Sequence, residues 1–294
     1  MEALERLVID RISLIRTLFD PSGVGLEIGP SYRPIAPKKD GFKVEILDHA
    51  SSDEMRLKYS NEPNVDSSLI EDVDFVWQGE TLLKTVNKVR HYDYIIASHV
   101  IEHLPDLLGF FRDCEALLRD EGVLVLAVPD RRRCFDLFRP NSTTGEVMQA
   151  HHEKRKVHAP ATAFDHIANM ITLSGLGAWN DGDTGPIDVL HDLEFAKFGF
   201  DRSVAETGYF DFHAWMFSPS SFRLIMDDLF KIGAVSLREA RVVLPDNEEF
   251  IVTMSRTGQG PGLSRLDLMR RVASETTFPE SAGGRAKSEP ALPG

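Results

Sequence analysis

The chain has 294 residues, of which 42% are hydrophobic, and its formal net charge at pH 7 is −13. This length allows one main domain with a large core, while the acidic balance argues against a nucleic-acid partner, because binding phosphates needs a broad basic face. No apolar run is long enough to span a bilayer and the N-terminus lacks the pattern of a secretion signal, so we expect a cytoplasmic protein with no membrane partner.

The first predicted element is a helix that ends before Gly23. Apolar residues recur with helical spacing between Glu2 and Phe19, and Asp20-Pro21 then stops the pattern. We therefore treat residues 1–22 as an N-terminal helix that packs on the main domain.

A strand, a tight loop and a second strand follow. Residues 24–28 form a short apolar run interrupted by Gly29-Pro30, and residues 42–47 form a second run that ends at Asp48. Three prolines lie between the two runs, so this connection should be irregular or one turn long. The glycine lets a ligand approach the backbone, and a carboxylate at the end of the second strand can accept hydrogen bonds from both hydroxyls of a ribose. The stretch predicts half of a nucleoside-binding site.

Helices and strands then alternate up to residue 128. A Ser-x-x-Glu capping box that begins at Ser51 predicts a helix to about Tyr59. The next predicted elements are a strand at 73–77, a helix at 82–89, a strand at 92–97, a helix at 106–119 closed by Gly122, and an apolar strand at 123–128. This alternation predicts an α/β fold with a doubly wound, mostly parallel sheet, which binds ligands at the carboxyl ends of its strands.

The pattern changes after the fifth strand. Residues 130–217 are polar and rich in histidine, with weak periodicity, which predicts a lid or substrate subdomain inserted into the main domain. The closing elements are a helix at 220–230 and two antiparallel strands at 234–243 and 249–254.

The main domain should therefore span residues 23–256. Beyond it, a rise in Gly, Pro, Ser and Ala predicts that residues 257–294 are mostly disordered, with helical spacing only from Leu263 to Val272.

Several chemically distinctive positions fall at the ends of successive predicted strands. They are Glu27-x-Gly29, Asp48, Gln78 and the stretch from Tyr92 to Leu104, which contains Glu102-His103. In this order and spacing the sequence resembles the class I S-adenosylmethionine-dependent methyltransferases, which have a Rossmann-like fold, over roughly residues 23–139. It looks closest to the small-molecule, type 11-like branch. Within that branch it is similar to members found in polysaccharide biosynthesis clusters, whose Pro-Asp-basic and Phe-Arg-Pro pattern is similar to residues 129–143.

This resemblance implies a site for S-adenosylmethionine. The residues that would line it are Glu27, Gly29, Pro30, Ser31 and Arg33 at the methionine end, Asp48 at the ribose, Trp77, Gln78 and Gly79 beside adenine, and Ser98 and His99 near the sulfonium. Two positions depart from the family's pattern. Ser31 and Arg33 stand where the family has glycines, so one of them would hold the donor's carboxylate, and Gln78 replaces the usual acid.

Each piece also has a simpler interpretation. Gly29 could serve only as a turn residue and Asp48 as a helix cap, while Glu102 and His103 could simply fix the loop that enters the next helix.

A basic cluster follows the fifth strand and consists of Arg131, Arg132, Arg133 and Arg139. Beside the carboxyl ends of the strands, such a cluster would suit an anionic acceptor, such as a sugar phosphate, a nucleotide sugar or a uronic acid. The alternative is a solvated run that pairs with surface acids.

Six histidines lie in or at the end of the insertion, but their spacing matches no metal-ligand pattern, so we predict no metal site. An alcohol stays protonated at neutral pH, so its methylation benefits from a general base, and histidine titrates in the right range. We rank His213 first because aromatic sequence surrounds it just before the chain re-enters the core. His166 and His151 follow.

Together these features predict an S-adenosylmethionine-dependent O-methyltransferase that acts on a sugar hydroxyl of a nucleotide sugar or glycan. Two alternatives stay open. A nicotinamide-dependent sugar reductase or epimerase would need a Gly-x-Gly-x-x-Gly loop that opens a full helix, and a Tyr-x-x-x-Lys pair, and the sequence has neither. The other alternative is a non-catalytic methyltransferase-like protein that only binds a ligand or partner.

Overall fold

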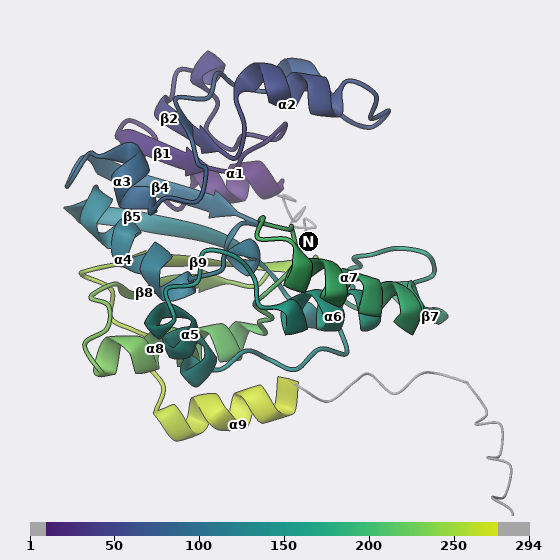
Figure 1. The fold of residues 1–294 in the computed structure, drawn as a ribbon. Coiled ribbons are helices and arrows are strands. Elements are labelled where there is room, and N and C mark those ends of the chain that lie inside the picture. Colours follow the sequence, from purple (N-terminus) through teal and green to yellow (C-terminus); the bar gives the residue numbers. More distant parts are fainter. Residues whose placement is uncertain (1–9, 276–294) are drawn as a thin grey trace, which may run out of the picture.

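The computed structural model describes residues 10–275, and a seven-stranded sheet forms its centre (Figure 1). The strands are β1 (Val24–Ile28), β2 (Lys43–Asp48), β3 (Phe75–Val76), β4 (Tyr92–Ser98), β5 (Leu118–Pro129), β8 (Arg238–Val243) and β9 (Glu249–Ser255). Their order across the sheet is β3-β2-β1-β4-β5-β9-β8, and β9 is antiparallel to both of its neighbours. The predicted mostly parallel sheet and the closing antiparallel pair are confirmed.

Nine helices lie within the described residues. They are α1 (Arg11–Arg16), α2 (Ser52–Tyr59), α3 (Leu82–Val86), α4 (Leu107–Leu117), α5 (Thr144–His152), α6 (Pro160–Ala168), α7 (Leu193–Ala205), α8 (Pro219–Lys231) and α9 (Arg265–Glu275). None of the helices in this part of the chain is long and apolar enough to cross a membrane.

The sheet separates two hydrophobic cores, because successive side chains of a strand point to opposite faces. On one face, Ile95 and Leu124 belong to a large core with apolar residues of α3, α4 and α8. On the other face, Tyr94 and Ile96 pack with Ile15 of α1 and with the connection between β1 and β2. The sheet is thus covered on both sides, as the doubly wound architecture requires.

Two local predictions near the N-terminus are confirmed. The connection from β1 to β2 contains only a 3-10 turn at Lys38–Asp40. At the start of α2, the Ser51 side chain accepts from the backbone of Glu54, and the Glu54 side chain accepts from the backbone of Ser51, which completes the capping box.

The prediction that Gly122 closes a helix is wrong. Helix α4 ends at Leu117, and Leu118 is already extended and pairs with Tyr92. Gly122 lies inside β5, where a Cβ would come within 3.0 Å of the Tyr92 carbonyl oxygen. The glycine therefore permits a close approach of two strands instead of a helix end.

Both ends of the described chain differ from the elements predicted in the sequence. At the N-terminus, α1 begins at Arg11 after an Asp10 cap, and the rest of the predicted helix lies outside the described residues. At the C-terminus, the helical spacing noted from Leu263 to Val272 coincides with helix α9, inside the segment for which we expected mostly disorder. Helix α9 packs on α8, with Leu268 fully buried and Arg265 paired with Asp228 at 2.7 Å. Residues 276–294 lie outside the described part of the chain.

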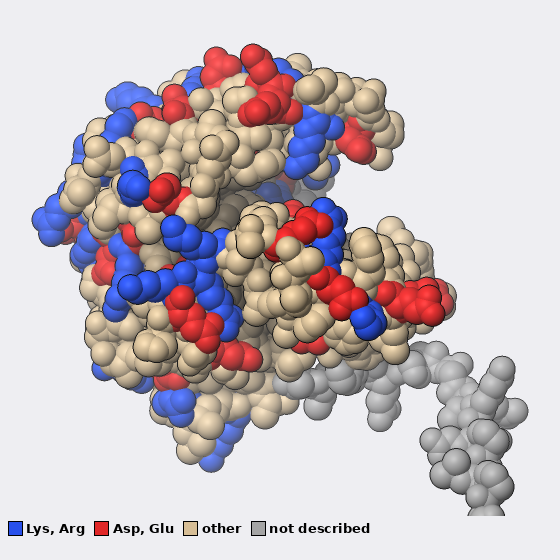
Figure 2. Space-filling view, viewed as in Figure 1, with Lys and Arg blue, Asp and Glu red and all other residues tan. Residues whose placement is uncertain are grey.

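The predicted insertion follows β5 and contains α5, α6 and α7, together with a small sheet of β6 (Ile171–Leu173) and β7 (Ile187–Val189). Helices α6 and α7 pack against each other and project beyond the central sheet (Figure 1). Figure 2 shows the molecular surface hollowed between this pair of helices and the lobe that carries α2.

Candidate active site

The carboxyl ends of β1 and β4 are the natural place for a ligand in this sheet. The two strands are neighbours, and the strand order reverses between them, since β2 and β3 lie on one side and β5 on the other. Loops that leave such a switch point open a crevice above the strand ends. We call the ends of β1 to β4 and the loops that follow them the donor edge.

The loop after β1 has an unusual backbone. Gly29 and Ser31 both have positive φ angles, of 63° and 52°, and a Cβ on Gly29 would come within 3.0 Å of Val100. The Ser31 hydroxyl oxygen is buried and has no hydrogen-bond partner among the described residues. A buried polar atom without a partner is costly and marks a place where a ligand can bind.

The Glu27 side chain holds the connection that follows β1 through hydrogen bonds to its backbone. Its two carboxylate oxygens accept hydrogen bonds from the backbone N–H groups of Ile35 at 2.6 Å and Ala36 at 2.9 Å. Burial raises the pKa of Glu27 to about 7, against the opposing effect of the two hydrogen bonds. Both oxygens of this buried side chain therefore hold the backbone of the loop.

Asp48 ends β2 and joins it to the same loop. Its carboxylate is 4% exposed and accepts from the Ser31 backbone N–H at 3.0 Å. The other carboxylate oxygen contacts the backbone nitrogen and Nδ1 of His49, each at 2.7 Å. Since the His49 side chain is 54% exposed, one side of the carboxylate is covered only by a surface residue.

The remaining predicted donor residues lie near this edge with different exposure. Trp77 is half-buried and donates through its indole nitrogen to the Glu80 carbonyl oxygen, while Gln78 and Gly79 are exposed. Arg33 is also exposed, and its guanidinium lies 5.4 Å from the centre of the Tyr32 ring.

An ion-pair network closes the edge beyond β4. Arg11 of α1 donates to both carboxylate oxygens of Glu249, at 2.7 and 2.8 Å, and to the Ser98 hydroxyl at 2.6 Å. Nε2 of His99 lies 2.9 Å from Glu249. Burial raises the pKa of Glu249, but the hydrogen bonds from His99 and Arg11 outweigh this effect and lower it to about 2. Sequence reasoning missed Arg11 and Glu249, since no local pattern marks either residue.

A second group of polar side chains lies directly after β4. One metal-ligand-type atom from each of Glu102, His103 and His213 lies within 4.8 Å of the other two, and we call these three residues the EHH cluster. The Glu102 side chain is 1% exposed, and neither carboxylate oxygen has a hydrogen-bond partner in the described chain.

A carboxylate lies close to the Nδ1 atom of each histidine in the EHH cluster. Nδ1 of His213 is 2.6 Å from Asp136, and Nδ1 of His103 is 2.8 Å from Asp211. Burial acts to raise the pKa of Asp136, but the hydrogen bond with His213 and the nearby charges lower it to about 2. Burial acts to lower the pKa of His103, yet the adjacent Asp211 carboxylate and the Glu102 charge raise it overall.

The other two histidines predicted as bases have different environments. His166 is buried next to His213, accepts from the His213 backbone N–H at 3.3 Å, and has a pKa lowered by burial to about 3. His151 lies on α5, where Nδ1 is 2.8 Å from Asp106 at the start of α4. His213 is thus the only one of the three predicted bases that belongs to the EHH cluster.

The arginines after β5 do not form an open basic cluster. Arg131 is 2% exposed and donates to the Asn141 side chain and the Leu137 carbonyl oxygen. Arg132 pairs with Asp130. Arg133 donates to the backbone carbonyls of Pro245 and Asn247. Arg131 and Arg132 thus bind groups of their own loop, while Arg133 binds the connection between β8 and β9. That these three arginines hold an acceptor stays a prediction.

Arg139 differs from these three. It is 3% exposed and its Nη1 donates to Asp136 at 2.8 Å and to the His213 carbonyl oxygen at 2.9 Å, while its Nε has no partner among the described residues. Arg139 lines a hollow of about 550 Å³, which we call the polar hollow. Its polar lining includes Asn141, Ser142, Glu146, Gln149, Arg155, His158, Thr162, Asp165 and Asn169.

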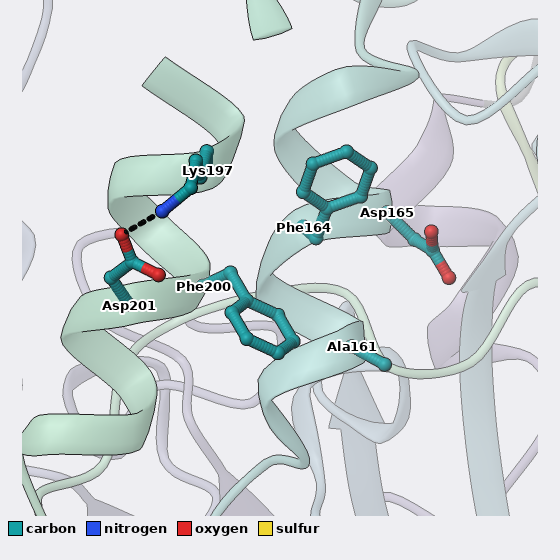
Figure 3. Close-up of a pocket in the computed structure, with 6 residues that line it drawn as sticks. All are labelled: Ala161, Phe164, Asp165, Lys197, Phe200 and Asp201. Carbon is teal, nitrogen blue, oxygen red and sulfur yellow. Dashed lines mark hydrogen bonds and ion pairs between the residues drawn. The ribbon is translucent and has the colours of Figure 1, made fainter. Parts of the chain in front are cut away.

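Another hollow, of about 350 Å³, lies between α6 and α7 (Figure 3). Phe164 and Phe200 line it together with the paired side chains of Lys197 and Asp201. It contains no residue of the donor edge or of the EHH cluster, so it is not a candidate active site.

The chain matches the family model described as a methyltransferase domain over residues 2–182, which is more than half of its length. The chain belongs to this methyltransferase family. As a member, the protein is an enzyme of methyl transfer, and its cofactor is S-adenosylmethionine. The comparison with curated proteins found no match.

Solved structures similar to this methyltransferase include three that cover most of it. A Rhodobacter sphaeroides protein provisionally described as a Zn-dependent alcohol dehydrogenase is 14% identical, with a TM-score of 0.45 and coverage of 83% of this chain and 88% of that one. A SAM-dependent methyltransferase from Methanosarcina mazei is 12% identical, with a TM-score of 0.44 and coverage of 84% and 98%. The CcbJ methyltransferase of Streptomyces caelestis is also 12% identical, with a TM-score of 0.44 and coverage of 83% and 93%. Likenesses at this level say nothing about the acceptor.

Proposed function

We propose that this methyltransferase transfers the methyl group of S-adenosylmethionine to a hydroxyl oxygen of a sugar, carried by a nucleotide sugar or a glycan. The observation that carries the proposal is the buried Asp136–His213 pair, whose Nδ1 contact of 2.6 Å leaves the other ring nitrogen available. This pair lies beside Glu102, directly after β4 and next to the donor edge. A hydroxyl acceptor needs such a proton-accepting group, whereas an amine is already nucleophilic when neutral.

The donor edge fits the cofactor. We assign Asp48 to the ribose hydroxyls, which can take the place of the exposed His49 side chain on its carboxylate. The unpartnered Ser31 hydroxyl is suited to the polar end of the methionine part. Trp77, Gln78 and Gly79 flank adenine in this assignment. Glu27 acts indirectly, because it holds the loop that contains Ser31.

When bound, the cofactor supplies an activated methyl group on a positively charged sulfur. The new O–CH₃ bond forms as the S–CH₃ bond breaks, and the bonding electron pair stays on the sulfur of S-adenosylhomocysteine. The chain must align the acceptor oxygen with this group, exclude water, and take up the proton of the hydroxyl. We assign the proton to His213, with Asp136 stabilising the positive charge that the imidazole acquires.

We assign the rest of the acceptor to the polar hollow. Its amide, hydroxyl and carboxylate groups are of the kind that bind sugar hydroxyls, and Arg139 connects the hollow to the Asp136–His213 pair. The free Nε of Arg139 also suits an anionic group on the acceptor. Of the arginines predicted to hold an acceptor, this assignment uses Arg139.

The two alternatives predict different behaviour. A nicotinamide-dependent enzyme would place a helix N-terminus on the pyrophosphate, but the connection after β1 contains only a 3-10 turn at Lys38–Asp40. A non-catalytic protein would bind the cofactor without transferring its methyl group.

The test is methyl transfer from isotope-labelled S-adenosylmethionine to a panel of nucleotide sugars and glycans, with neutral and uronic-acid members in matched pairs. We expect label on a sugar oxygen, located by fragmentation mass spectrometry, and faster transfer to the anionic member of a pair. Transfer only to nitrogen or carbon acceptors would overturn the proposal. Cofactor binding without transfer to any member of the panel would support the non-catalytic alternative.

A further inference from the structure

The Glu102 carboxylate needs a partner that the described chain does not provide. The side chain is 1% exposed, yet both of its oxygens lack hydrogen-bond partners in the described part of the chain. The imidazole nitrogens nearest to it, His99 Nδ1 and His103 Nε2, lie 3.7 and 3.8 Å away, which is too far for a hydrogen bond. A buried carboxylate in this state is strongly destabilising unless another charge lies beside it.

The two histidines of the EHH cluster have the arrangement that metal-binding histidines use. Metal-ligating histidines donate one ring N–H to a carboxylate or carbonyl, which orients the ring and fixes the lone pair on the other nitrogen. Nδ1 of His213 is within hydrogen-bond reach of Asp136 at 2.6 Å. Nδ1 of His103 lies 2.8 Å from Asp211, although the two groups are not aligned for a hydrogen bond in this structure. Each ring therefore has Nε2 available for an ion.

We infer that Glu102, His103 and His213 bind a divalent transition-metal ion. Their ligand atoms lie within 4.8 Å of one another, close enough to surround one ion after small side-chain movements. Two imidazoles and one carboxylate suit zinc, manganese, iron or cobalt, whereas magnesium and calcium prefer oxygen ligands only. Three protein ligands leave coordination positions open for water or substrate.

The catalytic role of this metal site rests on the proposed function. A bound ion would also change the role of His213. An ion in the EHH cluster lies directly after β4, beside the donor edge, where the acceptor hydroxyl should bind. A bound cation lowers the pKa of a coordinated hydroxyl, so the proton is lost to water. Nε2 of His213 is then a ligand, and it serves as a free base only when no ion is bound.

The test uses the full-length protein, stripped with a chelator and titrated with Mn²⁺, with binding followed by calorimetry and by loss of the free Mn²⁺ resonance signal. We expect one equivalent to bind. Glu102→Gln keeps the shape of the side chain but removes its charge, and should weaken binding at least tenfold. Asp211→Asn should weaken it by about 10- to 100-fold through His103. Glu62→Gln, on an exposed residue outside the cluster, should bind like wild type.

Melting curves establish that each variant is folded, and the outcomes separate the two proposals. An absence of Mn²⁺ binding, or equal binding by wild type and Glu102→Gln, would overturn the metal site. If the chelator-treated protein binds no Mn²⁺ but still methylates a sugar, the metal site is wrong and the proposed function stands with His213 as the base. If Mn²⁺ binds in the EHH cluster but no acceptor in the panel is methylated, the metal site stands and the proposed function fails.

Discussion

Asp48 tests the assignment of the donor edge. A carboxylate that accepts two ribose hydroxyls gains hydrogen bonds of about 1.5 to 3 kcal/mol each. Asp48→Ala should therefore weaken S-adenosylmethionine binding by roughly tenfold to several hundredfold, as measured by calorimetry. Asp53→Ala removes a nearby carboxylate that is 98% exposed and should leave affinity unchanged. Equal affinity of the folded Asp48→Ala protein and wild type would remove Asp48 from the site.

His213 tests the acceptor side independently of the donor. His213→Ala removes the group that acts on the acceptor proton, and it should lower kcat by about 10²- to 10⁴-fold with little change in donor affinity. His152→Ala, on an exposed histidine of α5, serves as the control. A His213→Ala enzyme with wild-type kcat at saturating acceptor across roughly pH 6 to 9 would contradict the assignment.

The role of a side chain could be predicted only where the residues next to it in the sequence indicate that role. Asp48 and Ser31 follow predicted strands, so their place at the donor edge could be derived from the sequence. Asp136, Asp211 and Glu249 gain their roles from contacts with distant histidines, and no spacing along the chain indicates those contacts.

The contribution of Glu27 to the stability of the folded protein should depend on pH. The pKa of Glu27 is raised from its ordinary 4.5 to about 7, so the folded state favours the protonated form. Its contribution to stability is complete below about pH 4.5 and is lost as the pH rises through about 7. The stability of wild type relative to Glu27→Gln should therefore decrease by up to about 3 kcal/mol between pH 5 and pH 8. Urea denaturation at both pH values measures this, and a difference independent of pH would contradict it.

Helix α9 offers a test of order at the C-terminus. Leu268 is fully buried where α9 packs on α8, and Leu268→Ala should cost about 2 to 5 kcal/mol in urea denaturation. Leu266 is on the same helix but is 54% exposed, so Leu266→Ala should change stability by less than about 0.5 kcal/mol. Similar stability of the two variants would show that α9 does not pack on the domain in solution.

The elements that could not be predicted are those held by long-range contacts. Composition indicated disorder after residue 256, but composition does not show the pairing of Arg265 with Asp228 or the burial of Leu268. The internal structure of the insertion was also missed. Helix α7 exposes Leu193, Phe195 and Phe198, which obscures the amphipathic pattern that marks a surface helix.

Binding of the correct cofactor should stabilise the molecule as a unit. A ligand that binds only the folded state adds about 2.7 kcal/mol at a concentration of 100 times Kd. S-adenosylmethionine and S-adenosylhomocysteine should therefore raise Tm by several degrees, while NADH should have no effect. Differential scanning fluorimetry makes the comparison, and stabilisation by NADH alone would favour the reductase alternative.

The overall fold was the most predictable level, because it follows from the order of strands and helices. The alternation up to β5 and the antiparallel closing pair predicted the sheet that the structure contains. The position of the insertion after β5 was also correct, since polar sequence without regular periodicity follows that strand. The EHH cluster could not be predicted, because it joins the loop after β4 to the end of the insertion.

The ion pair between Arg11 and Glu249 has a consequence for biosynthesis. These residues are 238 positions apart, and Glu249 also contacts His99. The ribosome makes β1, β2 and β4 long before β9, so the nascent chain holds Arg11 and His99 without their shared carboxylate. The contacts of Glu249 with Arg11 and His99 can therefore form only after β9 has been synthesised, so this edge of the sheet cannot be completed by the N-terminal strands alone.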